Sequence, residues 1–394
     1  MSNKTGQSGG GPLSSITVVD FTGNAAGPSC TMMLADFGAE VIKIEPPGGD
    51  ATRQWGQVRL GRNKDITPTF VSMNRNKRSL VLDLKNPADL ATARDLIAKA
   101  DVVVEAYAPG VAEKLGVGYA AAAKVNPKVI YCSVSGYGQT GPLTSRPGFD
   151  MLMQAFGGHM SITGERGRGS VRSGPSSIDL MTGAHGAFAI MVALRHRDQT
   201  GEGQAIDVSL YDSAVYMITN HVTEFMATGA LPEKFGADFP LLSPYGVFQA
   251  KDREFYLGVA TDKMWTRLCE AIGREDLGAD PRFEKVAGRL KHKEALFAAL
   301  EPILASRTGQ EWLDLALQLG IPASLIQNMG EVAAHEHTLA RDLVVDCGAY
   351  GLKTIGAPIK MSATPANPVR RPPPELDEYG ATLRQTAGAG SGAA

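Results

Sequence analysis

Short apolar runs alternate with helical stretches in the first third of the chain, and this alternation limits the fold more than any other feature. The helical stretches are 29–37 and 86–100, and Gly38 stands where a glycine commonly ends a helix. The apolar runs, expected as buried strands, are 16–21, 41–44, 79–83, 102–105 and 129–133. Strands that alternate with crossover helices predict an α/β fold with a parallel sheet covered on both faces. Ligands of such sheets bind at the carboxyl ends of the strands.

The charge balance gives no support for a nucleic acid or a membrane as partner. The 394 residues include 39 lysines and arginines against 41 aspartates and glutamates, so an anionic ligand must be held by local charges. No apolar run reaches the length that we expect of a membrane span. The four cysteines are far apart and lack metal-ligand spacing. We therefore predict a cytoplasmic protein in a reducing compartment, without a metal.

Composition also divides the chain into segments. Residues 1–12 and 386–394 are rich in glycine and small polar residues, and we expect a disordered lead-in and a disordered tail. The segment 231–243 is rich in Pro, Gly and Phe and is typical of a linker. A charged helical region at about 263–319 then predicts a second, smaller domain.

Asp179 stands between a turn-prone stretch, 173–178, and a long apolar stretch that ends near 196. This position predicts the N-cap of a helix, where a carboxylate accepts a backbone hydrogen bond and the helix dipole favours its charge. We therefore expect Asp179 to be ionised at neutral pH. An ionised carboxylate on a rigid helix is a suitable nucleophile for covalent acyl transfer. The alternative is that Asp179 is only a helix cap.

Seven short motifs give the chain a resemblance to one family. In this order and spacing they resemble the class III CoA-transferases, a group that includes formyl-CoA:oxalate CoA-transferase, carnitine CoA-transferase and α-methylacyl-CoA racemase. The resemblance covers about residues 13 to 385. The motifs lie at 19–28, 33–45, 74–79, 104–110, 147–150, 178–183 and 201–212.

The resemblance implies a fold that periodicity alone does not show. A large Rossmann-like domain is built from both ends of the chain, 13–230 and 326–385, and a smaller α+β domain, 231–325, is inserted between them. Two subunits form an interlocked homodimer. The active site lies where the large domain of one subunit meets the small domain of the other.

The resemblance also implies a reaction and its residues. Asp179 is the nucleophile, which attacks an acyl-CoA thioester and carries first an acyl anhydride and then a CoA thioester. The substrates are an acyl-CoA and a carboxylic acid, with no metal. By position in the family, the residues that bind CoA are Ala25, Ala26, Leu82, Asp83, Leu84, Lys85, Tyr107, Ala108 and Lys114.

Several positions depart from members of the family. Pro46 and Ala108 stand where arginine or histidine is frequent, so CoA phosphates meet fewer charges here, and Arg53 or Lys43 are possible substitutes. Ala25 replaces the glutamine of the oxalate enzymes, and 238–245 lacks their glycine run, which points away from formyl/oxalate exchange.

The acyl site implied by the resemblance also bears on the type of reaction. The racemases have a histidine at position 149, and a phenylalanine there cannot move a proton. A guanidinium at Arg172 suits a second carboxylate, which would fit a dicarboxylic acid as substrate; the alternative is that Arg172 has a structural role. The substrate-binding residues are Asn24, Phe149, Asp150, Arg172 and Tyr245, and for Asp150 a role as a turn or cap residue stays open. Three functions stay open: intermolecular CoA transfer, which we favour; acyl-CoA isomerisation, including an intramolecular CoA shift; and non-catalytic CoA binding.

Overall fold

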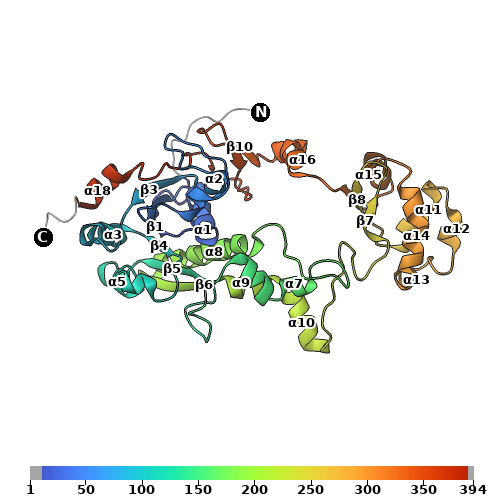
Figure 1. The fold of residues 1–394 in the computed structure, drawn as a ribbon, viewed down its shortest axis with the longest axis horizontal. Coiled ribbons are helices and arrows are strands. Elements are labelled where there is room, and N and C mark those ends of the chain that lie inside the picture. Colours follow the sequence, from blue (N-terminus) through green and yellow to red (C-terminus); the bar gives the residue numbers. More distant parts are fainter. Residues whose placement is uncertain (1–10, 389–394) are drawn as a thin grey trace. The chain divides into compact units, whose positions relative to one another are not determined.

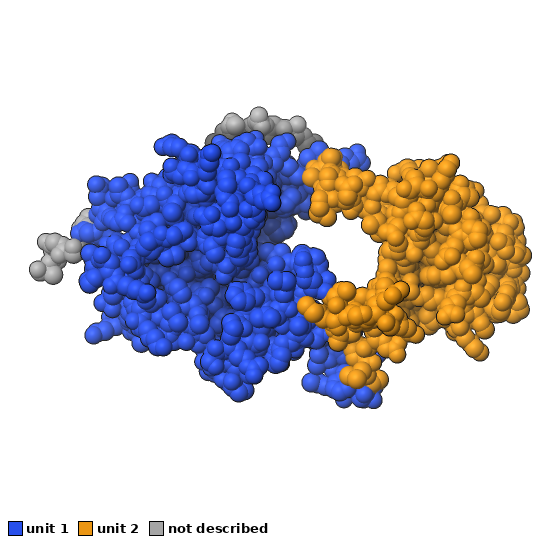
Figure 2. Space-filling view, viewed as in Figure 1, with its two compact units in different colours: residues 1–159, 172–229, 336–394 blue, residues 160–171, 230–335 orange. Residues whose placement is uncertain are grey.

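The computed structural model describes residues 11–388 and divides into two compact units (Figure 2). Unit 1 comprises 1–159, 172–229 and 336–394, less its undescribed ends, and unit 2 comprises 160–171 and 230–335. Most of the predicted lead-in, 1–10, and of the predicted tail, 389–394, lies outside the described residues. The tail prediction is wrong at 386–388, because helix α18 runs from Gly380 to Gly388. Leu383 and Ala387 on α18 are buried, which stabilises the helix beyond what its glycines predict.

Unit 1 contains a six-stranded sheet in the order β3-β2-β1-β4-β5-β6, and every neighbouring pair is parallel (Figure 1). The strands are β1 (Thr17–Phe21), β2 (Glu40–Glu45), β3 (Lys77–Val81), β4 (Val102–Glu105), β5 (Ile130–Ser135) and β6 (Gln204–Ser209). The predicted parallel α/β sheet is confirmed. This order is that of doubly wound dinucleotide-binding folds, in which ligands bind at the point where the strand order reverses, between β1 and β4.

Helices cover both faces of the sheet. One face packs under α1 (Ala26–Asp36) and α8 (Ser177–Thr200), and the other packs under α3 (Pro87–Lys99), α5 (Tyr119–Val125) and α18. The remaining helices of unit 1 are η1 (Ala51–Gln54), α2 (Pro68–Asn74), α4 (Val111–Lys114), α6 (Asp150–Phe156), α9 (Leu210–Met217), α10 (Thr219–Thr228) and α17 (Glu336–Ala340). Helix α7 (His159–Ile162) begins at the boundary with unit 2, and a hairpin of β10 (Val344–Asp346) and β11 (Lys353–Ile355) belongs to unit 1.

The chain's last segment returns to the sheet edge at β3. The Asp377 carboxylate accepts a hydrogen bond from the N–H of Val81 at 2.7 Å, and Arg371 forms an ion pair with Glu40 at 2.7 Å. Figure 1 shows α18 beside α3, and the two helices are in contact. Segments from both ends of the chain therefore build unit 1.

Unit 2 is an α+β body with its own core. Strands β7 (Tyr245–Gln249), β8 (Glu254–Gly258) and β9 (Ala323–Leu325) pair antiparallel. Its helices are α11 (Asp262–Ala271), α12 (Glu275–Ala279), α13 (Val286–Lys291), α14 (Lys293–Leu304), α15 (Gly309–Gln318) and α16 (Met329–Ala334). Trp265, Phe255, Leu300 and Trp312 are buried together at the centre of this core.

Several predicted boundaries shift for identifiable reasons. Helix α1 starts at Ala26 rather than 29, because Pro28 falls in the first turn, where a missing N–H costs nothing. Strand β3 starts at Lys77 rather than 79, because the amino group of Lys77 has buried partners, described below. Gly38 has a φ of 111° after α1, as predicted for the end of a helix.

Helix α8 bears on the prediction that no apolar run is long enough to span a membrane. It is 24 residues long, with a mean hydropathy of 1.4 in its most apolar window, and so meets the criteria for a candidate membrane span. A core helix of a soluble protein passes the same test. Here α8 packs closely on α1: a Cβ atom at Gly183 would lie 2.7 Å from the carbonyl oxygen of Ala26. The glycine of the 178–183 motif therefore allows the two backbones to approach.

Candidate active site

A cavity of about 1010 Å³ opens at the carboxyl ends of the central strands, as predicted for such a sheet. The turn 23–27 follows β1, 106–109 follows β4 and Gly136 follows β5, and all three line the cavity. The loop 146–151 and the start of α8 complete its wall.

Asp179 lines this cavity from the first turn of α8, but it is not the N-cap. The N-cap position is Ser176, and its side chain makes no capping hydrogen bond. Instead, Asp150 on α6 accepts hydrogen bonds from the N–H groups of Ile178 and Asp179, at 2.9 and 3.1 Å. The capping prediction for Asp179 is therefore wrong, because a carboxylate distant in sequence satisfies the helix terminus and leaves the Asp179 side chain unused for capping.

The prediction that Asp179 is ionised at neutral pH also needs correction. Burial raises the pKa of Asp179 to about 7, and the nearby charge of Asp150 adds to the increase. The carboxyl group is thus half protonated near pH 7. Sequence reasoning missed this because the increase comes from the cavity wall and from a residue 29 positions away.

Asp150 is itself held in place by buried partners. Gln154 is 1% exposed and donates from Nε2 to Asp150 Oδ1 at 2.5 Å. The Oε1 atom of Gln154 accepts a hydrogen bond from the N–H of Ser173 at 2.9 Å. This chain of contacts ties the loop before α8, the loop before α6 and the first turn of α8 to one another. It fixes the backbone that carries Asp179.

The predicted site residues fall into two groups. Those that line the cavity with Asp179 are Asn24, Ala25, Ala26, Tyr107, Ala108, Phe149, Asp150 and Arg172. Leu82, Asp83, Leu84 and Lys85 follow β3 and Lys114 ends α4, outside the cavity lining, and Tyr245 belongs to β7 of unit 2. The roles of both groups stay predictions.

Sequence reasoning missed several side chains of the cavity wall, among them Trp55, Met73 and Arg146. Trp55 is 46% exposed and follows the short helix η1, Met73 comes from α2, and Arg146 precedes the 147–150 motif. Arg146 directly adjoins a motif that was recognised, so its position was the available signal. Neither Trp55 nor Met73 lies in a pattern that points to a ligand.

The turn 23–27 is fixed by two buried lysines that lie beneath it. Lys43 donates from Nζ to the carbonyl oxygen of Thr22 at 2.7 Å and pairs with Asp50 at 2.8 Å. Lys77 donates to the carbonyl oxygen of Pro28 at 3.0 Å and pairs with Asp20 at 3.1 Å. The two lysines thus hold the two ends of a cavity wall, which explains the lysine in the 74–79 motif.

Lys43 and Arg53, the possible substitutes for the charges missing at positions 46 and 108, therefore bind other groups of the protein. Lys43 is fully buried in the network just described. Arg53 is 1% exposed, binds both carboxylate oxygens of Glu45 at 2.7 Å and donates to the carbonyl oxygen of Pro374. Neither side chain is available to CoA phosphates in this arrangement.

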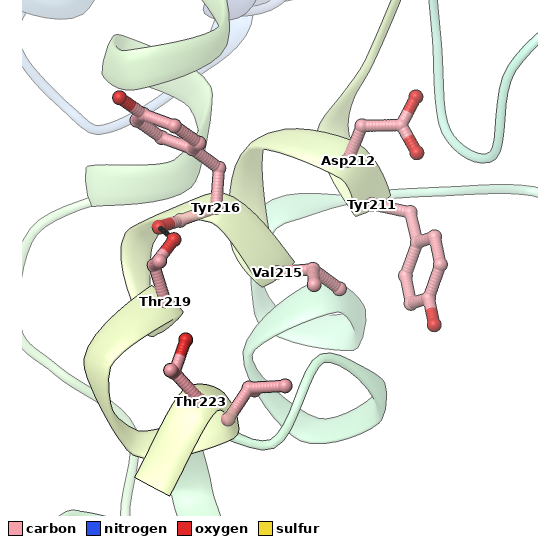
Figure 3. A pocket seen from close by; sticks show the side chains of 7 residues that line it. Tyr211, Asp212, Val215, Tyr216, Thr219 and Thr223 are labelled. Carbon is pink, nitrogen blue, oxygen red and sulfur yellow. Dashed lines mark hydrogen bonds between the residues drawn. The ribbon is translucent and has the colours of Figure 1, made fainter. Parts of the chain in front are cut away.

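A second, smaller pocket of about 430 Å³ lies on α9 and α10 (Figure 3). Apolar and hydroxyl-bearing side chains and one carboxylate line it: Tyr211, Asp212, Val215, Tyr216, Thr219, Val222 and Thr223. Within residues 11–388, no group of three or more His, Cys, Asp or Glu side chains could hold a metal.

The fold and the cavity are those of a doubly wound α/β protein with a carboxyl group poised at the ligand-binding end of its sheet. The model of CoA-transferase family III matches residues 13–379, and the chain belongs to this family. It is thus a class III CoA-transferase.

Two named relatives and a solved structure agree with this assignment. The acetyl-CoA:oxalate CoA-transferase of Acetobacter aceti is 39% identical over 95% of both chains. The succinyl-CoA:mesaconate CoA-transferase of Haloarcula hispanica is 37% identical, covering 97% of this chain and 98% of its own. A CAIB/BAIF family protein from Brucella suis has a TM-score of 0.91 at 32% identity, over 96% of this chain and all of that one.

Proposed function

We propose that the protein transfers CoA from an acyl-CoA to a free carboxylic acid through covalent intermediates on Asp179. The observation that carries the proposal is the position of this half-buried carboxyl group, in the cavity wall and free of any capping role. A cavity of about 1010 Å³ has the size of a cofactor site.

The proposed reaction proceeds through a series of acyl exchanges. An Asp179 oxygen attacks the thioester carbonyl carbon, the C–S bond breaks and CoA leaves as a thiolate. The thiolate then attacks the aspartyl carbonyl of the anhydride, which releases the donor acid and leaves CoA on Asp179. The acceptor carboxylate repeats the two steps in reverse and leaves as the new acyl-CoA. No step requires ATP, because each exchanges one activated acyl group for another.

The stabilisation of the tetrahedral oxyanion is part of the proposal. The N–H groups of Ile178 and Asp179 are already bonded to Asp150, so they are poor candidates for this role. Helix α1 begins in the cavity wall with no side-chain cap, and its first N–H groups suit an anion there. We therefore assign anion binding to Ala25, Ala26 and Gly27.

Phe149 supports transfer over racemisation. It lines the cavity and is 57% exposed, so the position that faces the substrate lacks a group able to carry a proton. A dicarboxylic acid is our proposed acceptor, because the relatives above are named for oxalate and for mesaconate with succinyl-CoA. The oxalate relative also keeps oxalate among the acceptors to be tested.

Exchange should depend steeply on pH, because only the ionised form of Asp179 is nucleophilic. With a pKa raised to about 7, activity is lost as pH falls through 7. We expect the single-turnover rate to rise about tenfold per pH unit between pH 5 and 6.5 and to level off above pH 8. Rapid quenching with acyl-CoA in excess would measure it. A flat rate from pH 5.5 to 8 would contradict the assignment.

We also propose a homodimer. Large apolar side chains are exposed on α8 and α10: Phe188 is 71% exposed, Val192 53% and Met226 79%. Apolar surface of this extent is typical of an interface. Light scattering should give twice the 41.7 kDa chain mass, and the mass of a single chain at micromolar concentration would refute the dimer. Other parts of the proposal come from the sequence predictions. They are the division into two domains, the CoA contacts outside the cavity, the role of Tyr245 in the acyl site and a cytoplasmic location.

A further inference from the structure

The charged residues of the cavity wall are few. Two are the carboxyl groups of Asp150 and Asp179, and the other two are the arginines Arg146 and Arg172. Among the described residues 11–388, no lysine or histidine lines the cavity. Within this part of the chain, the cationic side chains that a second carboxylate of a substrate would meet in the cavity are therefore the two arginines.

The two arginines differ in what their side chains already bind. Arg172 donates from Nη1 to the carbonyl oxygens of Ser173 and Gly174, at 3.1 and 2.8 Å, and so holds the loop before α8. Among residues 11–388, the guanidinium of Arg146 has no hydrogen bond, ion pair or ring contact in the structure. Its five N–H donors are thus open to a ligand.

The backbone around Arg146 is anchored close to the nucleophile. Its own N–H donates to the carbonyl oxygen of Leu143 at 2.9 Å, which closes a turn. Gly148 packs directly on Gly136, where a Cβ atom would lie 2.3 Å from the neighbouring Cα. Two residues later, Asp150 binds the N–H of Asp179. The loop is thus fixed to the end of β5 on one side and to the first turn of α8 on the other.

We propose that Arg146 binds the second carboxylate of a dicarboxylic substrate, with its guanidinium fork on the two carboxylate oxygens. The inference rests on the proposed CoA transfer through Asp179. It assigns substrate choice to Arg146 and loop support to Arg172, for which sequence reasoning left both roles open. A phosphate of CoA is the competing ligand for the same fork, and the experiment separates the two.

The test compares Arg146→Gln with the wild-type enzyme on two matched acceptors, succinate and butyrate, with acetyl-CoA as donor. Butyrate has the same chain length and lacks the second carboxylate. We expect kcat/KM for succinate to fall about 10- to 100-fold, mainly through KM, because a charge-assisted hydrogen-bonded pair is lost. The value for butyrate and the KM for acetyl-CoA should change less than about threefold. Arg146 is exposed, so the variant should fold.

Arg172→Gln is the matched control and should affect both acceptors alike. Equal losses for succinate and butyrate in Arg146→Gln, a raised KM for acetyl-CoA, or a selective loss of succinate in Arg172→Gln would each overturn the inference. So would a wild-type enzyme with no preference for succinate. If these results came with a covalent adduct on Asp179, only the inference would fail. Absence of both exchange and adduct in the wild type would overturn the proposed function as well.

Discussion

Replacement of Asp179 by asparagine is expected to lower CoA exchange by about 10⁴-fold or more, because the amide is not a nucleophile for a thioester. The variant keeps the size of the side chain and the hydrogen bond from the residue 179 N–H to Asp150. Initial rates of acyl-CoA formation from labelled acid would measure the loss. The matched control is Asp212→Asn, in the first turn of α9 and outside the cavity, which should retain the wild-type rate. An Asp179→Asn protein with more than a tenth of that rate would contradict the assignment.

The same substitution should stabilise the fold at alkaline pH. An unfolded aspartate has a pKa of about 3.9. In the folded protein the value is about 7, so ionisation costs the folded state stability as pH rises from 4 to 7, and the full cost persists above that. Discounted for a side chain partly open to solvent, the gain in free energy of unfolding for Asp179→Asn is about 2 kcal/mol at pH 8 and near zero at pH 3. A nucleophilic site that lowers stability is a common cost of function.

The largest expected effect on stability comes from Lys77→Met. The change removes the cation that pairs with Asp20, whose side chain is fully buried. It also removes the hydrogen bonds that Lys77 donates to Pro28 and Asn74. Breaking a buried ion pair from one side costs about 3–5 kcal/mol. Urea denaturation would measure the loss. Lys85→Met, at an exposed lysine beyond β3, is the control and should change stability by less than about 0.5 kcal/mol.

The Lys77→Met variant also tests what the network does for the cavity. If the lysine holds the turn after β1, the KM for acyl-CoA should rise at a temperature where the variant is still folded. An unchanged free energy of unfolding together with an unchanged KM would show that the network neither stabilises the fold nor positions the turn.

Sequence patterns predicted the parts of the fold that depend on local periodicity. The strands of the parallel sheet and the end of α1 at Gly38 follow from apolar runs and from the conformational freedom of one glycine. The start of β3 at Lys77 could not be predicted in this way. A lysine does not indicate a buried strand, and Lys77 is buried because it pairs with Asp20. Its partner is 57 positions away, which no local window includes.

The same distinction applies to the candidate site. The motif around Asp179 was visible because motifs are local. Its raised pKa was not. For Asp150 the sequence left open a cap or turn role and a role in shaping the site, because the outcome depends on where α6 packs against α8. Arg146 was not singled out, and for Arg172 both carboxylate binding and a structural role stayed open, since nothing in the sequence shows which guanidinium binds its own backbone.

Mass spectrometry of the intact protein, quenched within one turnover after mixing with acyl-CoA, tests the central claim most directly. The account predicts an increase by the mass of an acyl group or of CoA, located by peptide mapping on Asp179 and absent in Asp179→Asn. Hydroxylamine should remove the adduct and leave a hydroxamate at that residue. An active wild-type enzyme that carries no adduct, or an adduct on another side chain, would contradict it.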